Sequence, residues 1–272
     1  MSLILVQKCF QDDLSDPFCD PENPVILKFE DISAAAYRIK DGIIMTPCDA
    51  SHMNHDLDLD MYFKKDYMQF TGSFKERGAR YTLRKLSPEQ KRIGVIAASA
   101  GNHAQALAYH GGLLDIPVTV VMPIVAPIMK VENCKKYGAT VIIQGENIGE
   151  SRTHALKIAA KKGAVEKKEN LYNHMKCPGM MYVNGYDHPN ILAGQGTMGL
   201  EILDQVPDVD AIVIPVGGGG LIAGVALAVK TMKPDVKIIG VEPEACASFT
   251  TALKAGKPVQ TQTDASLADG QE

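Results

Sequence analysis

The sequence predicts an α/β protein that is built on parallel sheets and divided into two domains. From Arg92 onward, short apolar runs alternate with longer amphipathic stretches, which is the rhythm of strand–helix–strand units. The apolar runs are nearly continuous, as in strands that helices cover on both faces. A length of 272 residues allows one large domain or two smaller ones. We therefore expect a small domain at residues 88–175, inserted in a large domain formed by residues 1–87 and 176–272.

The N-terminal part lacks this alternation. Residues 11–24 are acidic and contain proline, which indicates an arm rather than a core element. Glu30 and Asp31 then open an amphipathic helix, with Asp31 as the expected N-cap. The apolar face of this helix comprises Ile32, Ala35, Ala36 and Ile39.

The middle of the chain supplies the small domain. Its strands are expected at residues 94–98, 118–122 and 139–143, where apolar side chains run together. A helix at residues 150–162 follows and ends in lysines, which suit the negative end of the helix dipole. Residues 161–181 have no period, and we expect a surface loop or a frayed helix there.

A second strand–helix–strand unit occupies residues 211–216, 221–232 and 236–241. Residues 211–229 carry no charge and approach the length of a membrane span. Pro215 and four consecutive glycines interrupt that stretch, so a strand, a loop and a helix explain it better than a spanning helix.

Composition excludes several classes of function. The net charge of −4 and the pI near 6.0 give no general attraction to nucleic acid or to anionic membranes. The apolar run at residues 3–6 is too short for a secretory signal, so we expect a cytoplasmic protein. The cysteines are scattered without metal-ligand spacing, and we expect reduced thiols. These cysteines are Cys9, Cys19, Cys48, Cys134, Cys177 and Cys246.

The first motif that could carry chemistry is residues 71–79, TGSFKERGA. In it, Lys75 lies among small residues that let other groups approach its side chain closely. The alternative is a solvated lysine that opens a helix, as most lysines are exposed. The second motif, residues 99–105 (SAGNHAQ), follows a predicted strand and begins a helix, so its backbone N–H groups suit an anion such as a carboxylate. Asn102 and His103 could instead merely cap that helix.

The third motif, residues 217–224 (GGGGLIAG), lies at another strand-to-helix junction, where bare backbone can surround a phosphate. A rival interpretation exists. Gly218, Gly220 and Ala223 also satisfy G-x-G-x-x-A, and Glu242 ends the next strand roughly 20 residues later, as in a dinucleotide-dependent oxidoreductase.

Taken together and in this order, the three motifs resemble the fold-type II (tryptophan synthase beta-like) family of pyridoxal-phosphate (PLP) enzymes that contains threonine dehydratases and serine racemases. The resemblance covers residues 29–270, and residues 194–197 (GQGT) and 241–243 (VEP) also match. It implies that Lys75 holds PLP as a Schiff base, with PLP between the two domains, Phe74 beside the ring and Asn102 at the ring hydroxyl. It assigns the phosphate to Gly217, Gly218, Gly219, Gly220 and Leu221, and the substrate carboxylate to Ser99, Ala100, Gly101, Asn102, His103 and Ala104.

The resemblance also implies a reaction, α,β-elimination from L-threonine or L-serine to give 2-oxobutanoate or pyruvate and ammonia. Racemases of the family resemble one another in carrying a serine before the Gly-Asn of the second motif, whereas this chain has Ala100, so racemisation is the second choice. A PLP-binding variant that does not turn over is a further alternative. If the chain folds, the family implies a homo-oligomer. Glu242 matches a cation ligand of relatives, but Ser248 replaces the companion carboxylate, so we expect weak or no divalent-cation binding.

The chain departs from the family pattern in two places. It interposes residues 164–180 at a connection between elements, where an insertion costs little loop entropy. Relatives also continue beyond the position of Gly270, so we expect a splice variant or fragment that lacks the C-terminal part of the large domain and is a poor catalyst.

Overall fold

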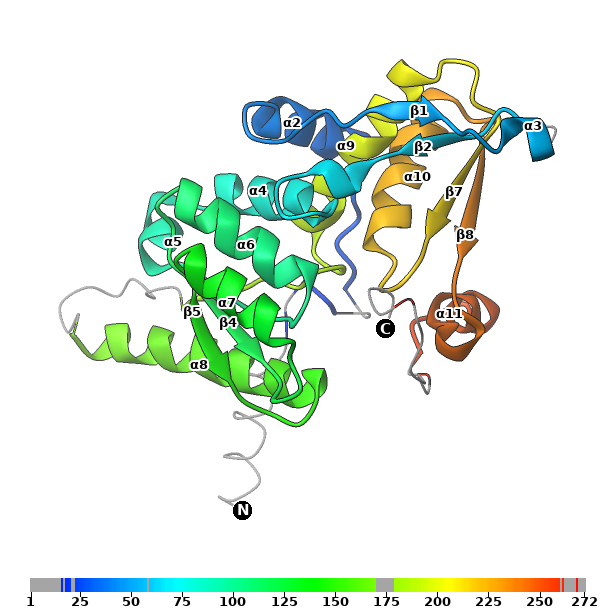
Figure 1. Ribbon diagram of the computed structural model, residues 1–272. Coiled ribbons are helices and arrows are strands. Elements are labelled where there is room, and N and C mark those ends of the chain that lie inside the picture. Colours follow the sequence, from blue (N-terminus) through cyan, green and yellow to red (C-terminus); the bar gives the residue numbers. More distant parts are fainter. Residues whose placement is uncertain are drawn as a thin grey trace. The chain divides into compact units, whose positions relative to one another are not determined.

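The computed structural model describes residues 16, 18–20, 23–57, 59–169, 179–259, 261 and 268. The chain folds into two compact α/β units, as the sequence predicts (Figure 1). Among the described residues, unit 1 comprises those of 1–25 and 83–188, and unit 2 those of 26–82 and 189–272. The described residues of the expected small domain, 88–175, lie inside unit 1, which also includes the described residues up to His188.

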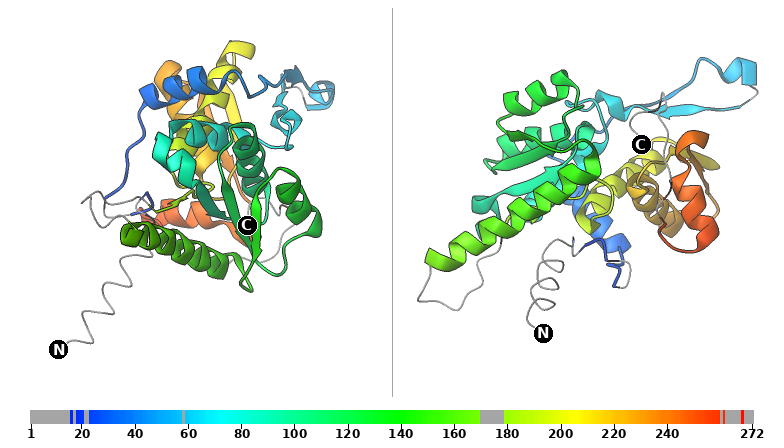
Figure 2. Two further views of the ribbon diagram at one scale, coloured as in Figure 1. Left: turned by 90° about the vertical axis from the view of Figure 1, so that its left-hand side faces the viewer. Right: turned by 90° about the horizontal axis from the view of Figure 1, so that it is seen from below.

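Unit 1 is built on a parallel sheet of strand order β5-β4-β3-β6. The register pairs Val95 with Val118 and Thr119 with Thr140. Helices α6 and α7 contact the sheet at β4 and β5, and the long helix α8 lies along the other side (Figures 1 and 2). The strands are β3 (Val95–Ala98), β4 (Val118–Met122), β5 (Thr140–Ile143) and β6 (Met181–Tyr182). The helices are α5 (Pro88–Ile93), α6 (Asn102–Leu113), α7 (Ile128–Lys136) and α8 (Ile148–Glu169).

The predicted strands of this unit are confirmed to within a residue. Helix α8 is longer than expected, since it runs to Glu169 through a stretch without apolar period. Residues 170–178, which include most of the inserted segment and Cys177, lie outside the described residues, as does most of the expected N-terminal arm. Strand β6 joins the sheet by pairing with β3, Val95 opposite Met181.

In unit 2, helix α9 packs against both α2 and α10, and strands β7 and β8 form a two-stranded parallel sheet with α10 on one side. Strands β1 and β2 pair as an antiparallel hairpin. The helices are α2 (Phe29–Ile39), α3 (Asn54–Leu57), α4 (Lys75–Lys85), α9 (Pro189–Gln205), α10 (Gly220–Met232) and α11 (Ser248–Ala255), with 3-10 turns η1 (Asp66–Met68) and η2 (Glu244–Cys246). The last three residues of α4 belong to unit 1. The strands are β1 (Cys48–Ala50), β2 (Tyr62–Lys64), β7 (Ala211–Pro215) and β8 (Lys237–Val241).

Burial along β7 alternates strictly, as in a strand with one covered face. Ile212 and Ile214 belong to the core of unit 2, whereas Val213 is 62% exposed. The expected cap of α2 is wrong by three residues. The N-cap is Lys28, and the Asp31 carboxylate, one turn into the helix, accepts a hydrogen bond from the Lys28 backbone N–H at 3.0 Å.

The four cysteines that the structure describes are free thiols. Within the described part of the chain, no helix combines the length and the apolar character that crossing a bilayer requires.

Candidate active site

Lys75 is the first residue of α4, and its side chain is half-buried. Burial lowers the pKa of the Lys75 ammonium to about 8, because desolvation disfavours the charged form. The amine lies 5.2 Å from the centre of the Phe74 ring. Phe74 in turn packs against the core cluster of unit 2, which contains Val216, directly before the glycine run, and Ile222, two residues after it. Lys75 and the glycine run are therefore linked through one apolar cluster.

Two residues after Lys75, the guanidinium of Arg77 is fully buried and forms hydrogen bonds with all five of its N–H groups. Asp66 accepts two of these bonds at 2.8 Å, Glu201 accepts two at 2.6 and 2.8 Å, and the Thr197 hydroxyl accepts the fifth at 3.1 Å. Lys64 adds a second cation, 2.5 Å from Glu201. The cluster of Arg77, Lys64, Asp66 and Glu201, here called the ion cluster, is balanced in charge and fixes the start of α4. Sequence reasoning missed it, since its members are far apart in the chain.

Glycines of the first and third motifs and of residues 194–197 allow close packing of helices. A Cβ at Gly78 of α4 would lie 2.9 Å from the Ile191 carbonyl oxygen of α9, and one at Gly194 would lie 2.5 Å from the Gly78 Cα. On the next face of α9, a Cβ at Gly224 of α10 would lie 2.7 Å from the Gly196 nitrogen. Helix α9 thus holds the helix that begins with Lys75 and the helix that follows the glycine run, at backbone contact with both.

The glycine run connects β7 to α10. Gly219 is the N-cap of α10 and has φ of +81°, a conformation that disfavours every residue with a Cβ. The first turn of α10 contains no acidic residue, so its N–H groups and the positive end of its dipole suit a phosphate. The Phe249 ring lies 3.4 Å from the position of a Gly219 Cβ and borders the run on one side.

The second motif occupies the matching position in unit 1. Residues 99–101 follow β3, and α6 begins at Asn102. A Cβ at Gly101 would find open space, and no acidic residue occupies the first turn of α6. The buried His103 ring contacts the Val183 carbonyl oxygen at 3.1 Å, so His103 braces the loop from within unit 1.

Helix α7 supplies two side chains that sequence reasoning missed. Lys130 Nζ donates to Asn102 Oδ1 at 3.1 Å, and Asn133 Nδ2 donates to Gln105 Oε1 at 2.9 Å. On each helix the two side chains are three residues apart, Asn102 and Gln105 on α6 and Lys130 and Asn133 on α7, and this spacing places them on one face of the helix.

The Glu242 carboxylate accepts hydrogen bonds from the Phe249 and Thr250 backbone N–H groups at 2.7 and 2.8 Å and from the Thr250 hydroxyl at 2.6 Å. Although partial burial opposes the charged form, these bonds hold the pKa of Glu242 below its usual value. Glu242 therefore caps α11. Within the described residues, no group of three or more His, Cys, Asp or Glu side chains could hold a metal ion. Weak or absent cation binding at Glu242 stays a prediction.

The residues present suit PLP. Lys75 offers an amine of lowered pKa, and the glycine run offers unobstructed N–H groups. The hydroxyls of Thr71 and Ser73, just before Lys75, are buried and have no hydrogen-bond partner among the described residues. Because an unsatisfied buried hydroxyl is costly, a bound group that pairs with them is favoured.

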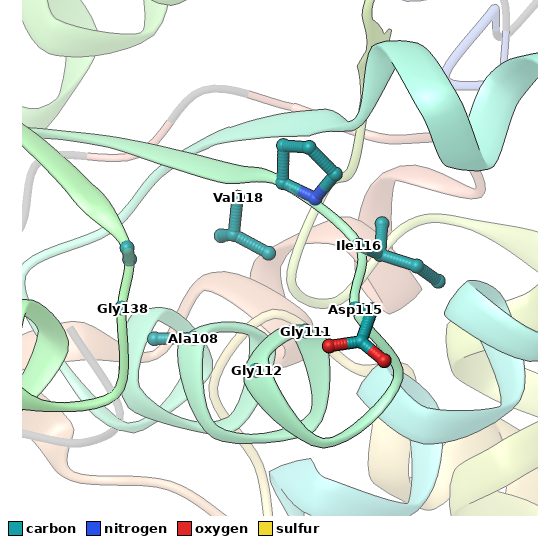
Figure 3. A pocket seen from close by; sticks show the side chains of 9 residues that line it. Ala108, Gly111, Gly112, Asp115, Ile116, Val118 and Gly138 are labelled. Carbon is teal, nitrogen blue, oxygen red and sulfur yellow. The ribbon is translucent and has the colours of Figure 1, made fainter.

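A hollow of about 380 Å³ lies in unit 1, at the C-terminal end of α6 (Figure 3). It is lined by Ala108, Gly111, Gly112, Asp115, Ile116, Pro117, Val118, Gly138 and Ala139. These residues lie where β4 and β5 begin, whereas ligands of parallel sheets bind where strands end. The hollow is thus at the opposite end of the sheet from residues 99–104.

Comparisons with known proteins identify the family of the chain. Residues 39–272 match the family model described as pyridoxal-phosphate dependent enzyme. The chain is 39% identical to an L-threonine ammonia-lyase of Thermotoga maritima, over 90% of this chain and 57% of that protein, and 42% identical to the catabolic L-threonine dehydratase of Staphylococcus aureus, over 90% and 67%.

Solved structures of the same family superpose on the chain. A processed form of threonine deaminase isoform 2 from Solanum lycopersicum superposes with a TM-score of 0.78 at 37% identity, over 89% of this chain and 62% of that one. Maize serine racemase superposes with a TM-score of 0.81 at 32% identity, over 91% and 70%. The chain spans somewhat more than half the length of the Thermotoga relative. It belongs to the fold-type II family of pyridoxal-phosphate dependent enzymes.

Proposed function

We propose that the chain carries the machinery of an L-threonine/L-serine ammonia-lyase. The observation that carries the proposal is Lys75, a half-buried lysine with a pKa of about 8 at the start of α4. It lies in a chain about 40% identical to threonine ammonia-lyases over nine tenths of its length. The glycine run, Gly217–Gly220 with Leu221, is proposed to hold the cofactor phosphate through backbone amides. Residues 99–104 are proposed to bind the substrate carboxylate.

PLP, when bound, withdraws electrons from the Cα of an amino acid. The protein's own residues then account for the rest of the proposed reaction. The Lys75 amine accepts the Cα proton, which its lowered pKa permits near neutral pH. Loss of that proton and of the Cβ hydroxyl as water gives a 2-amino-alkenoic acid. Water converts this acid to 2-oxobutanoate from threonine, or pyruvate from serine, and ammonia.

Position 100 supports elimination over racemisation. Reprotonation of Cα on the opposite face needs a second proton carrier, and Ala100 has none. The likeness to maize serine racemase keeps racemisation as the second candidate. A homo-oligomeric state and a cytoplasmic location stay predictions.

The test is to incubate the PLP-reconstituted chain with L-threonine and L-serine and to measure 2-oxobutanoate, pyruvate and D-serine. We expect the two oxo acids and no more than traces of D-serine. D-serine formed as fast as pyruvate would contradict the proposal. A PLP absorbance band without any product would favour the variant that binds the cofactor but does not turn over.

A further inference from the structure

Two side-chain amides at the start of α6 have their oxygens occupied by α7. Asn102 Oδ1 accepts from the Lys130 ammonium, and Gln105 Oε1 accepts from Asn133 Nδ2. An ammonium group can only donate hydrogen bonds, so the end of the Asn102 amide that faces Lys130 must be the oxygen. The Asn102 NH₂ group must therefore point away from Lys130.

The NH₂ groups of Asn102 and Gln105 have no hydrogen-bond acceptors in the described part of the chain. Gln105 is 4% exposed, and its Nε2 is buried without a partner. Asn102 is half-buried, and its Nδ2 forms no hydrogen bond with a described residue. Since buried donors are rarely left unpaired, the Gln105 amide points to a bound acceptor near the start of α6, which the accessible Asn102 NH₂ group could also reach.

The placement of charge indicates that this acceptor is anionic. Lys130 has no carboxylate within 4 Å among the described residues, and neither α6 nor α7 has an acidic residue in its first turn. An ammonium beside the positive end of a helix dipole is unfavourable on its own. A negatively charged oxygen at the start of α6 would offset both the charge of the Lys130 ammonium and the positive end of the helix dipole.

We propose that Lys130 is a positioning residue that orients the Asn102 amide to donate its N–H to an anionic oxygen at the start of α6. The inference rests on the proposed function, which takes Asn102 as part of the cofactor and substrate site. The anionic oxygen has two possible sources there, namely the ring oxygen of PLP and the carboxylate of the amino acid.

The experiment measures three dissociation constants. The first is that of the apo chain for PLP, and the other two are those of the PLP-loaded chain for L-alanine and for L-alaninamide. L-alanine has no leaving group on Cβ, and L-alaninamide has no carboxylate. Lys130→Met should weaken one of these interactions by about tenfold, as expected for a hydrogen bond to a charged group. Lys130→Arg, which keeps a cationic donor, should restore most of it. Lys135→Met is the matched control, because Lys135 lies on the same helix, is exposed and pairs with Glu132.

The arms separate the two sources. Weaker PLP binding by Lys130→Met identifies the ring oxygen, whereas weaker L-alanine binding with unchanged L-alaninamide binding identifies the carboxylate. In an Asn102→Ala background, Lys130→Met should have no further effect, since Lys130 acts through Asn102. Asn102→Asp, which presents oxygen in place of N–H, should weaken the same interaction at least as much and tests the idea even if Lys130→Met does not fold.

Unchanged constants in Lys130→Met and Asn102→Asp would overturn the inference and leave the proposed function intact. So would an equal loss from Lys130→Met in the Asn102→Ala background, since Lys130 would then act independently. A wild-type chain that binds no PLP would overturn both the proposed function and this inference.

Discussion

Replacing Arg77 with methionine tests whether the ion cluster holds the Lys75 end of α4. The substitution removes five hydrogen bonds from a guanidinium that is 0% exposed. Among the described residues, Lys64, which pairs with Glu201, then remains as the one cation of the ion cluster. One buried negative charge is then uncompensated. Breaking a buried ion pair in this way costs about 3–5 kcal/mol of unfolding free energy.

The assay is urea unfolding of the wild type and Arg77→Met, followed by fluorescence or circular dichroism. Arg77→Lys is expected to fall between them, because it keeps the charge but not the five-donor fork. Lys65→Met is the control, since Lys65 pairs with Asp49 at the surface and should leave the transition nearly unchanged. A loss below about 1 kcal/mol for Arg77→Met, the range of surface pairs, would refute the reasoning.

Acid dependence gives a second readout of the same variant. Burial opposes the charged form of Asp66, but hydrogen bonds and charge from Arg77 hold its pKa below the ordinary value of 3.8. In the wild type, Asp66 therefore contributes stability above pH 3.8, and this is lost as the pH falls through the lowered pKa. In Arg77→Met, burial acts with less opposition, so the pKa rises and this contribution should shrink or reverse. Identical acid-unfolding profiles for the two proteins would contradict the expectation.

Three further predictions concern Lys75, the glycine run and the Glu242 carboxylate. The apo chain should react with PLP faster as the pH rises through about 8, where the Lys75 amine loses its proton. Borohydride reduction followed by peptide mapping should place the pyridoxyl label on Lys75, and label on another lysine would overturn this assignment. Gly219→Ala forces a Cβ into φ of +81° and should cost about 1–2 kcal/mol in stability and weaken PLP binding, as measured by melting and absorbance; wild-type values for both would count against the phosphate role. Glu242→Gln should lower the melting temperature by loosening α11, while calorimetry with Mg²⁺ should show weak or no binding to either protein; tight binding that Glu242→Gln abolishes would show that the carboxylate is a cation ligand.

Strands β3, β4, β5, β7 and β8 were predictable from sequence because each is a nearly continuous apolar run. Strands β1 and β2 were not predicted, since each has three residues and carries a charged side chain. The runs at 95–98 and 118–122 are fully covered strands apart from the half-buried Ala98. The cap of α2 was mispredicted because Asp31 fits two positions at a helix start, and only the backbone of Lys28 distinguishes them. The full length of α8 was not predictable, since its last turns have no apolar period.

The candidate site was predictable only in part. Lys75, the glycine run and residues 99–104 stood out because glycines and small residues cluster near one reactive side chain. Lys130 and the ion cluster did not stand out, because their roles depend on pairings across 28 and 124 residues, such as Lys130 with Asn102 and Arg77 with Glu201. Single lysines and glutamates look alike in a sequence until the fold sets them beside a partner.

The backbone contacts of α9 with α4 and α10 have a consequence for how this protein can change over evolutionary time. In most cores, a substitution on one helix is absorbed by a shift of its neighbour. At Gly78, Gly194 and Gly224 there is no side chain to trim, so any larger residue must move a whole helix. Such a movement would alter the distance from Lys75 to the glycine run. We therefore expect loops and surface residues of unit 2 to vary freely among related proteins, while the spacing of these two helix starts stays constant.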